Sequence, residues 1–351
     1  MLKFILKKLF SGFFIILGVA IVVFVIFKVM PGDPVESMLG QQSDPSTKKK
    51  LAADMYLDQP LSTQFLFYMR DLSPVSIHKQ TEENQEKYKY LQLISFGKDV
   101  LVLKTPYLGR SIVSQRYVSD IIVERFPSTA WLALASITFA TILGIIIGVI
   151  AALKQGSIID RFLVTTSILG ISIPSFVSAV IIGLIFAVIL RDYTGLNLFG
   201  SLYETHAYTG VSFQPKNLIL PAITLGIRPL AVIVQLTRSS MIDAMKQDYI
   251  RTAKSKGLSM YSILFKHALR NALNPVITAI SGWFAGLLAG AFFIEKVFNW
   301  KGLGLETINA VFSLDFPVVI GSTLFIGGIF ILVSIIVDII YAWLDPRVRL
   351  H

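Results

Sequence analysis

The chain has 351 residues, of which 54% are hydrophobic and 15% are charged, and its formal net charge is +10. A soluble domain carries about 25% charged residues, so this composition excludes an ordinary soluble protein. The absence of cysteine also excludes disulfides and thiolate metal or redox sites.

Six apolar stretches predict an all-α, polytopic membrane protein with six transmembrane helices. Each is long enough to cross a hydrocarbon core of about 30 Å at about 1.5 Å per helical residue. The stretches are residues 10–27, 128–153, 162–190, 217–236, 275–294 and 316–337.

The first stretch follows three lysines, Lys3, Lys7 and Lys8, which is also the pattern of a cleaved signal peptide. Its length and the following "MPGDP", which offers no small-residue cleavage pattern, favour a retained anchor. We therefore predict an N-terminal signal-anchor helix over residues 1–30.

Residues 31–127 form a predicted extracytoplasmic loop large enough for a small subdomain. The "PGDP" sequence at Pro31–Pro34 cannot continue a helix, and helices are expected around 45–57 and 61–72. Two apolar runs at the end of the polar segment 73–103 are joined by Gly97-Lys98-Asp99, which predicts a β-hairpin.

Residues 128–351 form a predicted five-helix core with a cytoplasmic loop at 241–275. With the N-terminus inside, the cytoplasmic segments carry a net charge of +10 and the outer segments −1. This asymmetry follows the positive-inside rule. It places both termini in the cytoplasm and explains the basic charge without nucleic-acid binding.

Two prolines and an arginine interrupt the apolar helices. Pro174 lies in the third stretch and Pro229 in the fourth, where interior prolines bend helices that line a cavity, although proline is generally common in membrane helices. Arg228 is costly in a membrane, at about 2.5–3.5 kcal/mol. It either faces a translocation pathway, where it could meet a peptide carboxylate, or pairs structurally near the outer end.

Glycines recur every four residues in the fifth stretch, at Gly282, Gly286 and Gly290. A face without side chains permits close helix packing, either within this chain or against another subunit. We place Gly282 and Gly286, with Arg228, Pro229 and Pro174, in a candidate translocation pathway.

The cytoplasmic stretch Gln247–Pro275 combines small and apolar residues with basic ones. Residues 250, 253, 257, 261, 264 and 268 recur in steps of three and four, which predicts one face of one or two short helices, broken near Gly257-Leu258-Ser259. The stretch could lie on anionic lipid, form a solvated loop, or fit a groove of a cytoplasmic protein.

Two segments that overlap this stretch, "LTRSSMIDAMKQDYIRTAKSKG" (Leu236–Gly257) and "LFKHALRNALNPVI" (Leu264–Ile277), resemble the cytoplasmic Glu-Ala-Ala loop of ABC importer permeases. The chain as a whole is similar to the B-type permease subunit of oligopeptide and dipeptide importers. Further matching segments are "PGDP", "DQPLSTQF", "LGRS", "ISIPSF", "LPAITLG", "EKVFNWKGLGLETINAVFSLDFPVV" and "DIIYAWLDPRVRL".

This resemblance implies a type I ABC importer permease fold in a bacterial inner membrane. The implied partners are a paralogous permease subunit, two cytoplasmic ATPase subunits and an extracytoplasmic solute-binding protein. It also implies that the cytoplasmic stretch docks on the ATPases. The residues assigned to this ATPase-coupling loop are Asp248, Tyr249, Arg251, Thr252, Ala253, Lys256, Gly257, Leu258, Tyr261 and Leu264.

The chain departs from the family at three places. Arg251 stands where the general pattern has an acidic residue, and the expected proline near Arg270 is Pro275 here; the polypeptide-import branch resembles this variant. We interpret residues 73–103 as an insertion relative to the usual compact outer loop of the family.

The sequence contains no phosphate-binding G-x4-G-K-[ST] loop, no His-Glu-x-x-His pair and no G-x-S-x-G elbow. We therefore expect no catalytic or metal residues and no cofactor bound directly, with ATP and magnesium held by the partner subunits. Two alternatives stay open. One is a permease for nickel, glutathione or another small solute. The other is an ATP-independent channel or secondary transporter, for which Asp338 is the one candidate ion-coupling carboxylate.

Overall fold

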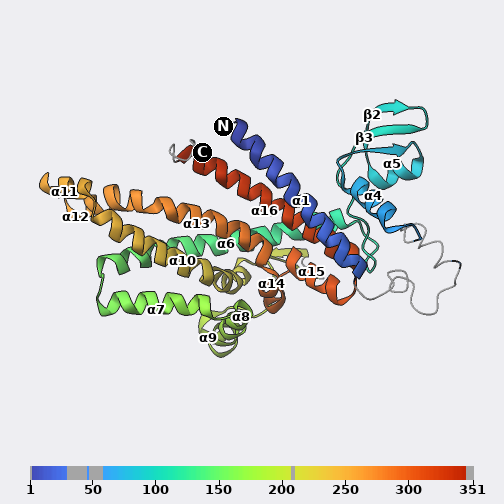
Figure 1. Cartoon of the computed structure of the whole chain (residues 1–351). Helices are drawn as coiled ribbons and strands as arrows, with labels where there is room; N and C mark the ends of the chain where they lie inside the picture. Colours follow the sequence, from blue (N-terminus) through green and yellow to red (C-terminus); the bar gives the residue numbers. More distant parts are fainter. Residues whose placement is uncertain (1, 30–45, 47–57, 207–209, 345–351) are drawn as a thin grey trace. The chain divides into compact units, whose positions relative to one another are not determined.

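Long helices dominate the computed structural model, which describes residues 2–29, 46, 58–206 and 210–344 (Figure 1). The predicted helix at 45–57, the "PGDP" segment and the Asp338 side chain lie outside what it describes. The chain divides into two units. Unit 1 contains residues 1–13, 125–306 and 326–351, and unit 2 contains residues 14–124 and 307–325.

Five described helices are long and apolar enough to cross a membrane. They are α1 (Leu2–Val29), α6 (Val118–Leu153), α10 (Ile219–Met245), α13 (Leu269–Gly290) and α16 (Phe316–Leu344). A sixth span exists if the bent pair formed by residues 158–172 and 175–189 is counted as one crossing. The predicted membrane-spanning helical fold is thus confirmed.

The prediction of a continuous third helix with a kink at Pro174 is wrong. Helix α7 (Ile158–Ser172) ends before Pro174, and α8 (Ser175–Gly183) begins after it and continues as the π-helical η1 (Leu184–Ile189). The two halves are bent by 108°. Proline disfavours helical backbone in the residue before it, and Ile173 is accordingly extended, at φ −84° and ψ 130°.

Small residues let the helices of unit 1 approach closely. A Cβ added to Gly144 or Gly148 of α6 would lie 2.6 Å from side-chain atoms of Ile233 or Thr237 on α10. Helix α10 also contacts α7, α8 and α13 (Figure 1). Because α10 packs against each of these helices, a movement of α10 requires its neighbours to repack.

Short elements connect the long helices of unit 1. Before α10 in the chain come α9 (Arg191–Thr194), β4 (Tyr203–His206), β5 (Gly210–Phe213) and the 3₁₀ turn η2 (Pro215–Leu218). After α10 come α11 (Asp248–Ser255), α12 (Met260–Ser262) and the π-helical η3 (Ile263–Ala268). After α13 come α14 (Phe292–Phe298) and α15 (Leu303–Phe312), whose residues from 307 on belong to unit 2.

Unit 2 contains a small α/β layer that the sequence predicts only in part. Its elements are α4 (Leu61–Leu72), β1 (Val75–Lys79), α5 (Glu82–Tyr88), β2 (Leu91–Phe96) and β3 (Asp99–Leu103). The strands form an antiparallel sheet in the order β1-β3-β2, and the predicted hairpin is the β2–β3 pair, with Gly97 at φ +67° in its turn. Helix α4 is also confirmed.

Candidate functional site

Local sequence signals determine the shape of the segment between α10 and α13. Gln247 is extended, at φ −72° and ψ 153°, and Asp248 is the first residue of α11. The carboxylate of Asp248 stabilises this helix, because it lies at the positive end of the helix dipole. Gly257 ends this part with φ +72°, a backbone conformation that glycine adopts without strain. Ser259 then caps α12 by accepting a hydrogen bond from the Ser262 amide. The predicted break at residues 257–259 is confirmed.

The small and apolar face of this segment is turned inward. It packs into a cluster within this chain, which we call the inner cluster: Met241, Ala244, Ile250, Ala253, Ile263, Ala268 and Ala272. Ala253, one of the residues assigned to the coupling loop, is 5% exposed and packs within this chain. The cluster fastens α11 and η3 to α10 and α13.

Gly257, in contrast, is exposed at the end of this part of the segment. No described residue comes within 4 Å of a Cβ built on it, and its positive φ is the feature that requires glycine. Leu264 is half-buried against the inner cluster. Gly257 is therefore open to a partner, whereas Leu264 contributes to the packing of the segment.

The remaining predicted residues lie on the exposed side of the segment, together with four that the sequence analysis did not assign. The sequence assigned Asp248, Tyr249, Arg251, Thr252, Lys256, Leu258 and Tyr261. The additional residues are Lys254, Met260, Phe265 and Lys266. Tyr261 and Phe265 stack with ring centroids 4.6 Å apart.

We call these eleven residues the coupling surface. Its centre is apolar and its surroundings are basic. Tyr261 is 71% exposed, and Leu258, Met260 and Phe265 are also exposed. An exposed aromatic and aliphatic centre with a charged rim is the pattern of a protein-binding surface. The one ion pair here, Arg251–Asp248 at 3.5 Å, is fully solvated and contributes little stability.

The pathway candidates fall into two groups. Pro229 is buried inside α10, whereas Arg228 is exposed. Gln235 and Ser239 are exposed as well and lie seven and eleven residues after Arg228, which places the three on one face of α10. The sequence analysis missed this polar row because Gln235 and Ser239 are uncharged.

The other pathway candidates lie at the bend before α8 and on α13. Pro174 is exposed at the bend before α8. Within the described chain, no heavy atom lies within 4 Å of a Cβ built on Gly282 or Gly286 of α13. The described part of the chain thus places no other element directly against these two glycines.

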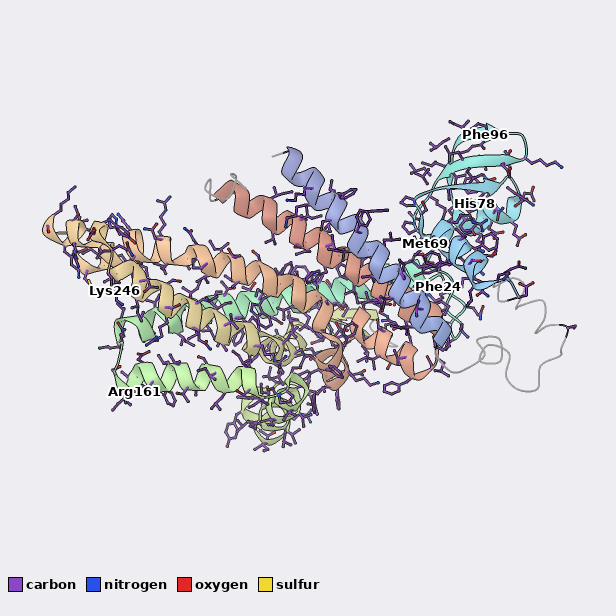
Figure 2. All side chains as sticks on the ribbon, in the orientation of Figure 1. Phe24, Met69, His78, Phe96, Arg161 and Lys246 are labelled. Atoms are coloured by element: carbon purple, nitrogen blue, oxygen red, sulfur yellow. The ribbon has the colours of Figure 1, made fainter. Side chains whose placement is uncertain are left out.

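A buried ion pair joins the start of α7 to α10, and the sequence analysis did not identify it. Arg238 donates from Nε and Nη2 to the two carboxylate oxygens of Asp160, at 2.6 and 2.7 Å. Asp160 also accepts from the Gly156 amide at 2.8 Å. Nearby Arg161 and Lys246 lie at the same end of unit 1 (Figure 2). Because 78 residues separate the partners, local pattern analysis could not pair them.

A buried carboxylate organises the segment between α13 and α16. Glu295 of α14 has no exposed surface. It accepts hydrogen bonds from Thr129 Oγ1 at 2.6 Å and from the Leu305 amide at 2.8 Å. A Cβ on Gly302 would lie 2.5 Å from the carboxylate. Burial raises the pKa of Glu295 to about 7, although these hydrogen bonds act in the opposite direction.

In unit 2, an aspartate joins two of the sequence segments that carry the family resemblance. Asp315, from "SLDFPVV", accepts hydrogen bonds from Ser111 Oγ at 2.5 Å and from the amides of Ile112 and Val113. Ser111 belongs to "LGRS". These contacts fix the loop that precedes α6.

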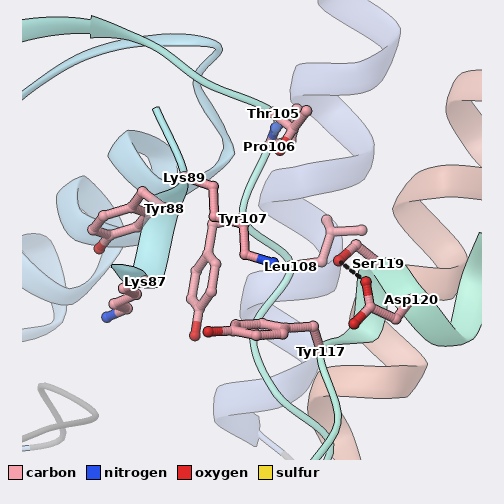
Figure 3. Close-up of a pocket in the computed structure, with 11 residues that line it drawn as sticks. Lys87, Tyr88, Lys89, Thr105, Pro106, Tyr107, Leu108, Tyr117, Ser119 and Asp120 are labelled. Carbon is pink, nitrogen blue, oxygen red and sulfur yellow. Dashed lines mark hydrogen bonds between the residues drawn. The ribbon is translucent and has the colours of Figure 1, made fainter. Parts of the chain in front are cut away.

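The pocket in unit 2 is too small for a peptide (Figure 3). Its volume is about 50 Å³, which admits only a few water molecules at about 10–15 Å³ each. Lys87 and Lys89 on its wall already lie over the rings of Tyr107 and Tyr117, at 5.1 and 5.4 Å. Among the described residues, no group of three His, Cys, Asp or Glu could hold a metal.

Comparisons with known proteins agree with this geometry. Residues 144–350 match the family described as "Binding-protein-dependent transport system inner membrane component", and residues 1–85 match its N-terminal counterpart. The chain is 34% identical over 351 residues to the dipeptide transport system permease protein DppB of Bacillus subtilis (strain 168), covering 100% of this chain and 99% of that protein.

Two further matches extend the comparison. The chain is 34% identical over 349 residues to the glutathione transport system permease protein GsiC of Salmonella typhimurium (strain LT2), covering 99% of both. Among solved structures it resembles the MetNI methionine ABC transporter in inward-facing conformations, with 16% identity, a TM-score of 0.51 and coverage of 65% of this chain and 97% of that chain. At this identity the structural match shows the fold alone.

Proposed function

Because this chain belongs to the binding-protein-dependent transport system inner membrane component family, and is thus a permease subunit of an ABC importer, we propose that it forms half of a translocation pathway for di- or oligopeptides. The names of the two relatives support this cargo, since one is a dipeptide permease and the other transports glutathione, itself a tripeptide.

The proposed partners follow from surfaces that the chain leaves uncovered. A paralogous permease would pack on the glycine side of α13, where Gly282 and Gly286 have no neighbour in the described chain. Two ATPase subunits would serve the pair, one of them against the coupling surface. A solute-binding protein would deliver the peptide. Both termini of this chain would lie in the cytoplasm, because its inner segments are basic.

The coupling surface is the single observation that carries this mechanism. Its exposed residues lie on α11, α12 and η3, whose buried residues share the inner cluster with α10 and α13. A displacement of the coupling surface would therefore move the two helices that bear Arg228 and Gly282. ATP can shift the permease between states only through contacts that differ in each state, and this arrangement would supply them.

Arg228 is the proposed contact for the cargo. Its exposed position on a membrane-spanning helix is costly unless an anion or water meets it, and Gln235 and Ser239 continue a polar face from it. The C-terminal carboxylate of a peptide would pair with the guanidinium. This assignment favours peptides with a free C-terminus over cations such as nickel.

The test uses the assembled importer in proteoliposomes, with ATP hydrolysis as the readout. The binding protein would be presented with a dipeptide, with glutathione or with Ni²⁺. We expect stimulated hydrolysis and uptake with a peptide. Stimulation by Ni²⁺ alone would contradict the peptide assignment, and uptake without ATP would contradict the importer mechanism.

A further inference from the structure

One face of the unit 2 sheet is apolar and exposed. The strand register aligns Val75, Leu103 and Leu91 in one row across the sheet, and Ile77, Leu101 and Ile94 in the next. Paired residues of antiparallel strands point to the same side. We call the exposed members, with Phe96 in the third row, the sheet face: Val75, Ile77, Leu91, Ile94, Phe96 and Leu103.

The opposite side of the sheet is the covered one. Val100 and Val102 are fully buried there, and His78 of β1 stacks near Tyr88 of α5 with ring centroids 4.3 Å apart. The sheet thus has one layer of its own core and one unpartnered apolar layer. A two-sided sheet of this kind needs a second partner for its open layer.

The sheet is attached to the membrane helix α1 through α4. Phe24 of α1 contacts Phe65 and Tyr68 of α4, with ring centroids 5.2 and 5.5 Å apart. At the end of α4, Asp71 accepts hydrogen bonds from Tyr88 Oη through its carboxylate and from Lys104 Nζ through its carbonyl. Figure 2 labels one residue on each of three elements along this connection: Phe24 on α1, His78 on β1 and Phe96 on β2.

The attachment point fixes the depth of this layer relative to the bilayer. The apolar span of α1 runs from Lys7 to Ile26, so Phe24 lies within its last turn, at the membrane boundary. Val22 and Val25 nearby are exposed, and Leu61 and Leu66 of α4 are exposed as well. Exposed apolar residues therefore occur on α1, on α4 and on the sheet that α4 attaches to it.

The composition of the sheet face favours lipid over a protein partner. Five of its six residues are aliphatic and the sixth is Phe96. Protein interfaces are enriched in Tyr, Trp, Phe, Met and Arg, of which the sheet face contains only Phe96, whereas elements that lie in the bilayer interface bury Leu and Phe beside lysines at the rim. Lys79 and Lys98 occupy that rim, at the end of β1 and in the hairpin turn.

We propose that the sheet face lies on the lipid surface, inserted at the level of the headgroup boundary, in the leaflet at the Phe24 end of α1. Unit 2 would then be a monotopic anchor beside the permease, in addition to its membrane helices. The proposal depends on α1 spanning the membrane and not on the identity of the cargo.

The absence of native cysteine makes a direct test available. Single cysteines at Ile94 and, as a matched control, at Ser95 would carry a nitroxide label on the full chain in lipid nanodiscs. Ser95 pairs with Val100, so it is exposed on the opposite side of the same strand. A label at Val22 gives the reference for lipid exposure.

We expect the Ile94 label to relax with dissolved oxygen as the Val22 label does, and the Ser95 label to relax with a water-soluble nickel chelate. The same measurement on the assembled importer should give the same result. Accessibility of the Ile94 label to the nickel chelate would overturn the proposal. Protection of that label from both reagents would also overturn it, since a protein would then cover the sheet face.

Discussion

Replacing Tyr261 by alanine perturbs the coupling surface at its most exposed aromatic residue. Tyr261 is 71% exposed, and an aromatic side chain buries about 150–250 Å², so a partner could cover about 140 Å². At about 25 cal/mol per Å² this is at most about 3.5 kcal/mol. Since alanine retains part of the contact, we expect a loss of about 2–3 kcal/mol, or about 30- to 150-fold in ATPase affinity.

The assay measures binding of the ATPase subunits to the permease pair in nanodiscs, together with ATP-driven uptake. Tyr193→Ala is the matched control, because Tyr193 is 89% exposed and lies on α9 outside the coupling surface. We expect the control to bind the ATPase with unchanged affinity. Both variants should keep the wild-type melting temperature, since neither side chain is packed in the core.

Wild-type ATPase affinity and uptake in Tyr261→Ala would refute the assignment of the coupling surface. An equal loss in Tyr193→Ala would refute it too, because the effect would then not depend on location. A lowered melting temperature restricted to Tyr261→Ala would show that the residue supports the fold rather than the docking.

Three further predictions concern other sites. Arg228→Gln should lower uptake of peptides with a free C-terminus more than uptake of C-terminally amidated peptides, with partial recovery in Arg228→Lys; equal losses for both cargoes would contradict carboxylate recognition. Arg238→Ala leaves the Asp160 carboxylate without its partly buried ion pair, which should cost about 1–3 kcal/mol, measured by thermal unfolding, whereas the double variant Asp160→Asn/Arg238→Ala should recover part of this loss. The pKa of Glu295, raised to about 7, means that the folded state holds a proton that the unfolded state releases above its ordinary pKa of about 4.5. The contribution of this group to the free energy of unfolding is therefore present below pH 4.5 and falls by about 3 kcal/mol as the pH rises to about 7. In Glu295→Gln the melting temperature should change less with pH between 4.5 and 7 than in the wild type. The same dependence of melting temperature on pH in both proteins would contradict the reasoning.

The membrane helices could be predicted from the sequence because lipid requires long apolar stretches. Their ends were less predictable, since α6 begins at Val118 and α10 continues to Met245, beyond the apolar stretches 128–153 and 217–236. The β2–β3 hairpin was predictable for a similar reason, since Gly97 separates two short apolar runs. The break at Pro174 was signalled by the proline, but its size was not. A proline can bend or end a helix, and the choice depends on what packs around it.

The coupling segment shows where sequence periodicity becomes ambiguous. Ile250, Ala253 and Ala268 do share one side, as their spacing predicts, but spacing does not indicate whether that side meets a partner or the same chain. The neighbouring ends of α10 and α13 supply Met241 and Ala272, and they cover it. Phe265 was not assigned from the sequence, because it lies in a π-helical turn that changes the periodicity there.

The Asp160–Arg238 pair and the hydrogen bonds of Glu295 could not be read from the sequence. Each joins residues from distant parts of the chain, and charged residues near membrane boundaries are frequent for topological reasons alone. Their pairing depends on how α7, α10 and α14 pack, which follows from glycine contacts that no local pattern specifies.

The central claim, that this chain is the membrane path of an ATP-driven peptide importer, is tested most directly by accumulation of a labelled dipeptide in proteoliposomes that contain the complete complex. The account predicts that the dipeptide rises above its external concentration only when ATP and the loaded binding protein are both present. Equilibration of the dipeptide across the membrane without ATP would contradict it.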